Sequence, residues 1–249
     1  RSVLNQMIDL HCHILPGIDD GPQTIEESIN MLKIAASEGI SIIAATHHFI
    51  DEEHTPLSYL AELEKGLMKL QPAIEELRAN IRILRGAEVY ISPFLLSIDG
   101  LDKLCINGSR YLLVELPMLD IPQYAEEVIY GLRLKGIVPI IAHPERNRRI
   151  EKRPELLRPL IKLGALSQVN TGSITGLFGR EAQRCAKHLF KHNMAHLISS
   201  DAHTPRRRAP YMKDAARLLT KWVGRDAADR IVNVTPKAVI NDIYIDATL

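Results

Sequence analysis

The chain has 249 residues, of which 46% are hydrophobic and 24% are charged. This length allows a sizeable hydrophobic core, in one large α/β domain or two small ones, and the composition is ordinary for a soluble globular protein. A formal net charge of +1 argues against a dedicated nucleic-acid-binding protein, which usually carries a basic excess on one face.

The cysteines and the apolar runs indicate a cytoplasmic protein. Cys12, Cys105 and Cys185 are widely spaced and form no CxxC pair, so we expect no disulfide framework and a reducing compartment. No apolar run approaches the length of a membrane span, and the N-terminus carries no signal-peptide pattern, so we expect no membrane insertion. Residues 1–6 precede a methionine and are interpreted as an expression-vector remnant, which leaves residues 7–249 as a single expected domain.

The first half of the chain alternates apolar runs with helical patterns. Its first predicted strand, residues 7–13, ends in His11-Cys12-His13, and on a β-strand both histidines point to the same face. A capping-box pattern at residues 24–27 opens a helix that stops at Gly39. The pattern also predicts a helix over residues 56–79, which Pro72 breaks or kinks. Three further strands are predicted at residues 40–46, 81–87 and 111–114.

The second half repeats this alternation without a linker or a low-complexity stretch. Strands are predicted at residues 137–142, 165–169 and 195–199. Helices are predicted over residues 123–135, 154–163, 179–192, 209–223 and 236–243. Seven strand-then-helix units imply a parallel sheet with right-handed crossovers. We expect a closed or nearly closed barrel rather than an open sheet, because nearly every strand ends in a polar group, and in a barrel these ends meet at one mouth.

The polar groups at the strand ends are imidazoles and carboxylates. They are His11, His13, Asp20, His48, Glu88, Glu115, His143, Asp201 and His203. Uncompensated buried carboxylates cost several kcal/mol each, and divalent cations offset that cost. Mixed nitrogen and oxygen ligands suit Mn²⁺, Fe²⁺ or Zn²⁺ better than Ca²⁺ or Mg²⁺. Nine donors exceed the needs of one ion, so the sequence predicts two or three ions, bridged by Glu88 or Asp201.

Cations close to these donors indicate a phosphate site. Arg146 follows His143 by three residues, and Arg206, Arg207 and Arg208 follow His203 closely. Guanidinium groups bind phosphate oxygens through paired hydrogen bonds, and a metal cluster lowers the pKa of a bound water and clamps phosphoryl oxygens. The sequence contains neither a Cys-x5-Arg loop nor a Gly-x-Ser-x-Gly elbow, so covalent catalysis by cysteine or serine has no support.

These motifs resemble the PHP (polymerase and histidinol phosphatase) superfamily. Within it, the chain is similar to the manganese-dependent bacterial protein-tyrosine phosphatases of capsule and exopolysaccharide operons, the CpsB/YwqE type. The resemblance extends from Met7 to about Ile245. The motifs that carry it are Ile8-Asp9-Leu10-His11-Cys12-His13, Asp19-Asp20-Gly21, Thr46-His47-His48, Gly86-Ala87-Glu88, Glu115-Leu116-Pro117, Ala142-His143-Pro144-Glu145-Arg146 and Ser200-Asp201-Ala202-His203.

The resemblance implies a distorted (β/α)7 barrel with three metal ions, most often manganese, at its C-terminal mouth. By motif position, one ion would be held by His11, His13, Glu88 and Asp201, a second by Glu88, Glu115 and His143, and a third by Asp20, His48 and His203. Arg146 and Arg208 fall where the family places its phosphate-binding arginines, so the implied catalytic residues are Arg146, Arg208, Glu88 and Asp201. Relatives usually have a small residue or proline at the position of His47, so either His47 or His48 is the ligand.

The resulting hypothesis is a phosphatase that hydrolyses phosphotyrosine by a metal-activated water, acting on the C-terminal tail of a bacterial tyrosine kinase that regulates capsule synthesis. A histidinol-phosphate or other small-molecule phosphatase is the alternative within the superfamily, because the metal cluster recognises only the phosphate. A proofreading-type nuclease is disfavoured by the near-neutral charge. A metal-stabilised binding scaffold is disfavoured because a structural site would be closed.

Overall fold

The computed structural model of the protein describes residues 6–77 and 80–248. The vector remnant predicted at residues 1–6 lies outside this range, apart from Gln6. The strands are β1 (Met7–Cys12), β2 (Ile40–Ala45), β3 (His48–Phe49), β4 (Arg82–Arg85), β5 (Glu88–Tyr90), β6 (Tyr111–Glu115), β7 (Val138–Ala142), β8 (Leu166–Asn170) and β9 (Leu197–Ser199).

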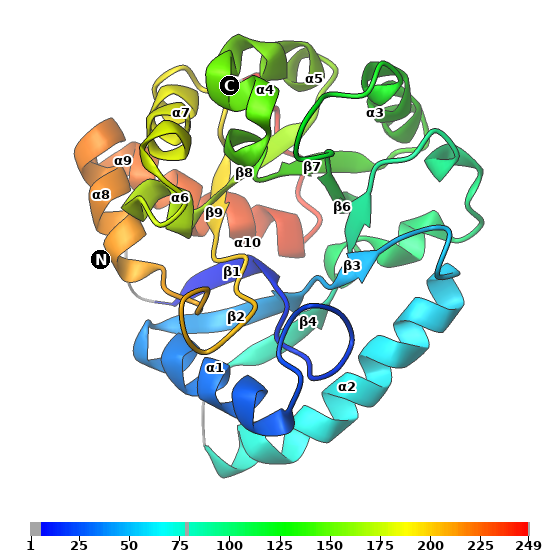
Figure 1. Cartoon of the computed structure of the whole chain (residues 1–249), viewed down its shortest axis with the longest axis vertical. Coiled ribbons are helices and arrows are strands. Elements are labelled where there is room, and N and C mark those ends of the chain that lie inside the picture. Colours follow the sequence, from blue (N-terminus) through cyan, green and yellow to red (C-terminus); the bar gives the residue numbers. More distant parts are fainter. Residues whose placement is uncertain (1–5, 78–79, 249) are drawn as a thin grey trace.

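The strands pair in parallel and form a distorted (β/α)7 barrel (Figure 1). One sheet has the order β1-β2-β4 and the other β3-β5-β6-β7-β8-β9. Along the chain β3 continues β2 and β5 continues β4, and a parallel bridge between Cys12 and Ala202 joins β1 to the segment after β9. The strands therefore occupy seven positions around a ring in the described part of the chain, which confirms the predicted fold class.

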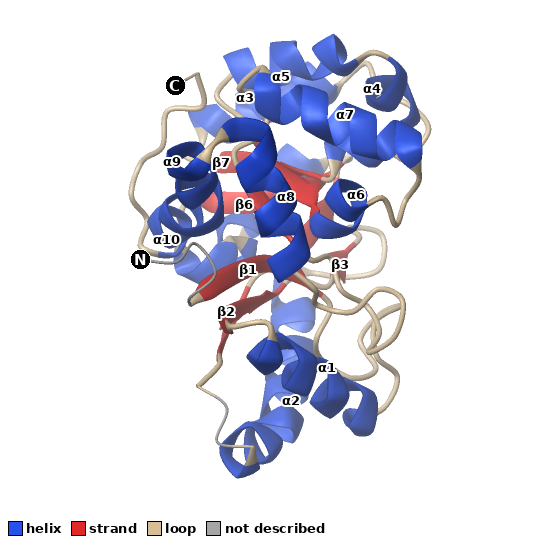
Figure 2. Ribbon diagram, turned by 90° about the vertical axis from the view of Figure 1, so that its left-hand side faces the viewer, coloured by secondary structure: helices blue, strands red, loops and turns tan. Residues whose placement is uncertain are grey.

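The helices surround this ring. They are α1 (Ile25–Ser37), α2 (Pro56–Glu76), α3 (Ala125–Leu134), α4 (Arg148–Lys152), α5 (Arg158–Lys162), α6 (Thr171–Thr175), α7 (Arg180–Lys191), α8 (Lys213–Val223), α9 (Arg225–Asp229) and α10 (Thr235–Ile240). Figures 1 and 2 place α1 and α2 outside the three-stranded sheet, and α3, α4, α5 and α7 on the opposite side of the molecule. Because the strands are parallel, their C-terminal ends lie at the same end of the ring, the mouth of the barrel.

Local sequence signals explain where the first helices begin. Thr24 caps α1, because its hydroxyl accepts a hydrogen bond from the Glu27 amide at 3.3 Å, as the capping box predicts. Of the predicted break or kink at Pro72 in α2, the break is wrong, since the helix runs on to Glu76. Pro72 removes a single backbone bond close to the end of a helix whose inner face, including Leu63 and Leu70, is buried against the barrel.

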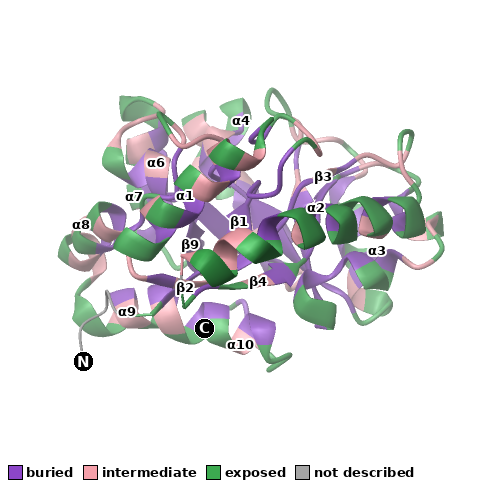
Figure 3. Cartoon of the chain, turned by 90° about the horizontal axis from the view of Figure 1, so that it is seen from below, coloured by how far each residue is buried: buried purple, intermediate pink, exposed green. Residues whose placement is uncertain are grey.

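The core lies between the strands and the inner faces of the helices. Every residue of β1, β7 and β8 is buried, which is typical of parallel strands covered on both sides. Figure 3 shows buried strands at the centre and exposed outer faces on α1 and α2. Within residues 6–77 and 80–248, no helix combines the length and apolar character required to cross a membrane.

Candidate metal centre

The barrel brings the nine predicted ligand side chains to one mouth. His11 and Glu115 lie in β1 and β6, His48 and Glu88 open β3 and β5, and the others lie in loops that follow strands. Four groups built from these nine have donor atoms that all lie within 4.8 Å of one another. The groups are His13, Asp20, His48 and His203; His11, Glu88 and His143; His11, His13 and Asp201; and His48, Glu88 and Glu115.

Glu88 lies at the centre of this arrangement. Its Oε2 atom is 3.2 Å from His11 Nε2, 3.3 Å from His13 Nε2 and 3.1 Å from His48 Nδ1. Its Oε1 atom is 3.0 Å from His143 Nε2. The Glu88 side chain is only 1% exposed, so a buried carboxylate contacts four imidazoles, which come from β1 and the loop after it, from β3 and from the loop after β7. A group in this position can bridge neighbouring ions.

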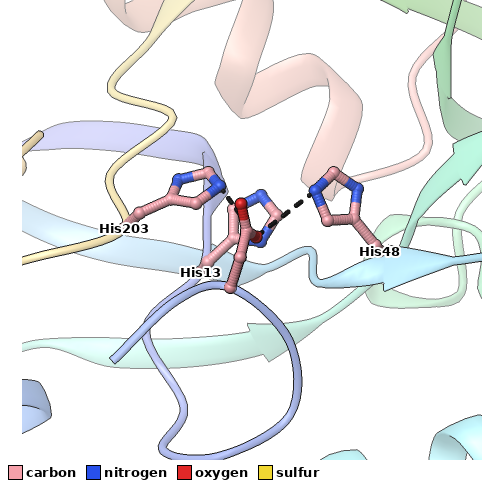
Figure 4. A group of neighbouring side chains, drawn as sticks. His13, His48 and His203 are labelled. Atoms are coloured by element: carbon pink, nitrogen blue, oxygen red, sulfur yellow. Dashed lines mark ion pairs between the residues drawn. The ribbon is translucent and has the colours of Figure 1, made fainter. Parts of the chain in front are cut away.

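A second group lies closer to the solvent (Figure 4). The rings of His13, His48 and His203 converge on Asp20, whose Oδ1 atom is 3.3 Å from His203 Nε2 and 3.5 Å from His48 Nε2. His13 and His203 stack with ring centroids 3.8 Å apart. The Asp20 side chain is 63% exposed whereas that of His13 is fully buried, so this group connects the deep centre to the mouth.

The donor set fits divalent metal ions. Asp201 Oδ1 is buried and accepts no hydrogen bond from any residue that the structure describes, so it has a lone pair free for a cation. His13 Nδ1 donates to Asp19 Oδ2 at 2.6 Å, and His11 Nδ1 donates to Gln168 Oε1 at 2.8 Å. In the neutral rings these bonds place the proton on Nδ1, so that each Nε2, 3.4 Å from the other, could bind a cation.

The charges in the site are strongly coupled. Burial disfavours the charged form of His11, but the Glu88 and Asp201 carboxylates outweigh burial and raise the pKa of His11 to about 9. Burial raises the pKa of Asp201, but His11, His143 and Arg208 more than offset it, so this pKa lies below its usual range. Burial and the Glu88 charge raise the pKa of Glu115. Without a cation, protonated imidazoles such as that of His11 compensate the negative charge of the carboxylates.

The two adjacent histidines differ in their hydrogen bonds. His47 Nδ1 donates to Asp19 Oδ1 at 2.8 Å, and its Nε2 accepts from the Leu15 amide at 3.0 Å. Both nitrogens of His47 therefore have partners within the fold. His48 faces Glu88 and Asp20 with its two nitrogens. This geometry favours His48 as the ligand and His47 as a support for the loop after β1.

The two predicted phosphate arginines meet on one carboxylate oxygen. Arg146 Nη1 and Arg208 Nη2 donate to Asp201 Oδ2 at 3.1 and 2.8 Å. Their side chains are 20% and 27% exposed, so each guanidinium keeps donors at the mouth. Arg206 is 82% exposed and pairs with Glu27 at 3.3 Å, and Arg207 is exposed as well, so both lie in a solvent-exposed part of this loop.

Sequence reasoning missed the residues that hold the ligands. Besides its two histidine partners, Asp19 accepts from the backbone amides of His48 and Gly21 at 2.9 and 3.0 Å. Gln168 donates to Asn170 at 2.8 Å, and Asn170 donates to Asp201 Oδ2 at 2.6 Å, which links His11 to Asp201 through β8. The i, i+2 spacing of these two amides, the same as that of His11 and His13, was the available signal.

Two candidate ligands have a left-handed backbone. His143 has φ 30°, and Asp201 has φ 50°. Residues other than glycine rarely adopt this region, and such strain is found where the surrounding structure fixes a functional side chain. Both residues come directly after a barrel strand or its short extension, so the turn aims each side chain back over the mouth.

Comparison with known proteins agrees with this geometry. Residues 7–241 match the family described as capsular polysaccharide synthesis, CpsB/CapC. The tyrosine-protein phosphatase YwqE of Bacillus subtilis is 37% identical over 226 residues, which cover 88% of this chain and 86% of that protein. The putative tyrosine-protein phosphatase CapC of Staphylococcus aureus is 38% identical over 207 residues, with coverages of 83% and 80%.

A solved structure extends the similarity to the whole fold. It comes from work on YwqE of Bacillus subtilis and CpsB of Streptococcus pneumoniae, described as unique metal-dependent tyrosine phosphatases. It superposes on this chain with a TM-score of 0.88 and 33% identity, and covers 96% of each chain. The chain belongs to the CpsB/CapC family.

Proposed function

We propose that this protein is a metal-dependent protein-tyrosine phosphatase. The observation that carries the proposal is the convergence of two partly exposed arginines on Asp201, directly beside the donor groups centred on Glu88. Family membership supports the same reading, because the relatives reported above are named tyrosine-protein phosphatases.

The proposed ligand sets are those that the motif positions imply. The donor groups of the structure contain the same residues in other combinations, with His143 beside His11 and Glu115 beside His48. One ion would be held by His11, His13, Glu88 and Asp201, a second by Glu88, Glu115 and His143, and a third by Asp20, His48 and His203. The mixture of imidazole and carboxylate donors favours a transition metal, and we propose manganese, with iron or zinc as alternatives. Bound ions would supply a Lewis acid for the phosphoryl oxygens and lower the pKa of water.

The protein's own residues bind and orient the phosphate. Arg146 and Arg208 present in-plane N–H donors that match the oxygens of a phosphoryl group. Asp201 holds both guanidinium groups in place through Oδ2 and keeps Oδ1 for a cation. Glu88 fixes the positions of four imidazoles around one point. Asp201 and Glu88 therefore couple the phosphate-binding groups to the metal ligands.

The cysteines support hydrolysis without a thiol nucleophile. Cys12, Cys105 and Cys185 are free and buried. Burial raises the pKa of each thiol, so the nucleophilic thiolate is scarce at neutral pH. Reduced cysteines also agree with a cytoplasmic location, where the phosphotyrosine tail of a bacterial tyrosine kinase would be the substrate.

The experiment that tests this proposal is a substrate panel after manganese loading. The panel contains a phosphotyrosine peptide, the matching phosphoserine peptide and histidinol phosphate. We expect the phosphotyrosine peptide to give the highest kcat/KM. Preference for histidinol phosphate would instead assign the protein to the small-molecule phosphatases.

A further inference from the structure

We propose that Phe178 is a positioning residue that holds Arg146 and Arg208 in the orientation required for phosphate. The inference rests on the proposed phosphatase function and adds a residue to its phosphate-binding machinery. Phe178 lies in the turn between α6 and α7, far along the chain from either arginine. It contacts no candidate metal ligand in the interactions described above, so its role is distinct from that of the metal centre.

The ring of Phe178 lies beneath both guanidinium groups. The Cζ atom of Arg146 is 4.3 Å from the ring centroid, and the Cζ atom of Arg208 is 5.9 Å from it. Both distances lie within the range of about 6 Å at which a cation is attracted to the negative face of an aromatic ring. One half-buried aromatic side chain therefore contacts both of the cations that converge on Asp201.

The fold fixes the position of this ring. A Cβ atom added to Gly172 in α6 would lie 2.7 Å from Phe178 Cε2, so the ring packs directly on this glycine and would have to shift to admit a larger residue. The Leu177 amide donates to the Gly172 carbonyl at 2.8 Å, and the Gly179 amide donates to the Gly176 carbonyl at 3.1 Å. These bonds hold the turn on both sides of Phe178.

The arrangement meets two requirements of a phosphate site. Two like charges close together repel, and Asp201 Oδ2 is one acceptor shared between them. The ring face adds a second attraction that stabilises both cations. A ring also contacts a guanidinium through its face and leaves the in-plane N–H groups free, whereas a carboxylate in the same place would compete with phosphate for them.

The decisive experiment separates the effect of the ring's shape on phosphate binding from the effect of its electrostatic face at position 178. Phe178→Leu removes the ring, Phe178→Tyr retains it, and replacement of Phe178 by pentafluorophenylalanine keeps the ring shape but removes its negative face. The probe is inorganic phosphate, whose dissociation constant for the manganese-loaded protein is measured by calorimetry and as a competitive inhibition constant. Elemental analysis reports whether each variant keeps its metal.

We expect Phe178→Leu and the pentafluoro variant to weaken phosphate binding by about three- to tenfold with unchanged metal content. Phe178→Tyr should bind phosphate as the parent protein does. In turnover of a phosphotyrosine peptide, the change should fall mainly on KM. Tyr244→Leu is the matched control, because Arg133 lies 5.9 Å from the centroid of that ring, and the ring is 58% exposed. It should leave phosphate binding unchanged.

Phosphate binding that is normal in the pentafluoro variant would overturn the inference, since Phe178 would then act only through its shape. Weakened phosphate binding in Phe178→Tyr would overturn the inference too, as would loss of metal from the variants. Failure of the unaltered protein to hydrolyse phosphotyrosine is a separate result. Combined with phosphate binding that depends on the ring, it would contradict the proposed function and leave this inference standing.

Discussion

At the scale of single residues, the proposed metal and phosphate sites depend most on Glu88 and Asp201. Each is buried, each contacts imidazoles, and Asp201 also receives both arginines. Removing one member of such a buried, charge-compensated set leaves its partners uncompensated, which is costly. Substitutions at these positions and at their partners should therefore separate metal assembly from phosphate binding.

The first prediction compares two isosteric substitutions. Glu88→Gln should lower kcat by at least about a hundredfold, because loss of the carboxylate would weaken the binding of ions that contribute several kcal/mol of transition-state stabilisation. Asp20→Asn should cause a clearly smaller loss, since the Asp20 side chain is 63% exposed and water can replace it. The measurement is turnover of a phosphotyrosine peptide at saturating manganese. Near-normal turnover in Glu88→Gln would show that Glu88 is no bridge.

The second prediction concerns the arginines. Arg146→Ala and Arg208→Ala should each lower kcat/KM by about one to two orders of magnitude, because each removes charge-assisted hydrogen bonds to phosphate. Metal content should not change, since Asp201 Oδ1 stays available. The solvated Arg206 and Arg207 are the matched controls, and their alanine variants should behave like the parent protein.

The opposite ranking, with Arg207→Ala inactive and Arg208→Ala harmless, would contradict the placement of the loop after His203. Loss of metal from Arg146→Ala or Arg208→Ala would instead make these arginines structural supports of the ligand shell.

The third prediction concerns the thiols. Burial raises the pKa of Cys105 to about 12, and the pKa values of Cys12 and Cys185 are raised as well. A raised thiol pKa keeps the group protonated until the pH approaches that value, so at neutral pH little thiolate is present. Iodoacetamide at pH 7.5 should therefore leave activity unchanged. Inactivation in step with alkylation of one cysteine would contradict a thiol-independent mechanism.

At the scale of elements, the pattern of apolar residues and the positions of polar groups along the chain predicted most of the fold. Apolar runs that end in a polar group identified the barrel strands, and the capping box at Thr24 identified the start of α1. The sequence did not reveal that two strand positions of the barrel are interrupted. One divides into β2 and β3 after Ala45, and the other divides into β4 and β5 after Arg85. A tertiary contact lies at both breaks, and such contacts have no local sequence pattern.

That contact is made by Tyr59 of α2, whose buried hydroxyl donates to the His47 and Gly86 carbonyls at 2.8 and 3.1 Å. The fourth prediction is that Tyr59→Phe lowers the free energy of unfolding by about 1–2 kcal/mol, because the Gly86 carbonyl loses this partner. Urea denaturation measures the change. Tyr130→Phe, at a 53% exposed site on α3, is the control and should have little effect. Equal stability of both variants would contradict this role.

The supporting residues escaped prediction for a physical reason. Asp19, Gln168 and Asn170 act on the ligands through side-chain hydrogen bonds that cross the barrel. Phe178 acts through a ring face. Apart from the i, i+2 spacing of Gln168 and Asn170 on β8, these interactions impose no spacing along the chain. By contrast, ligands at strand ends follow directly from the alternation of side chains on a strand and from the common direction of parallel strands.

At the scale of the whole molecule, the metal centre joins elements from both sheets. His11 comes from the three-stranded sheet, and Glu88 comes from the six-stranded one. Ions that bind only the folded barrel should stabilise it, since ligand binding to the native state adds to the free energy of unfolding. At a hundred times the dissociation constant, one ion contributes about 2.7 kcal/mol, which corresponds to a rise in Tm of about 5–10 °C for a chain of this size.

The proposed function requires that hydrolysis of phosphotyrosine depend on bound metal ions. Elemental analysis should find two or three transition-metal ions per chain in the purified protein. Dialysis against a chelator should abolish hydrolysis of a phosphotyrosine peptide and lower Tm together, and added Mn²⁺ should restore both. Undiminished hydrolysis by protein shown to be free of metal would contradict the account.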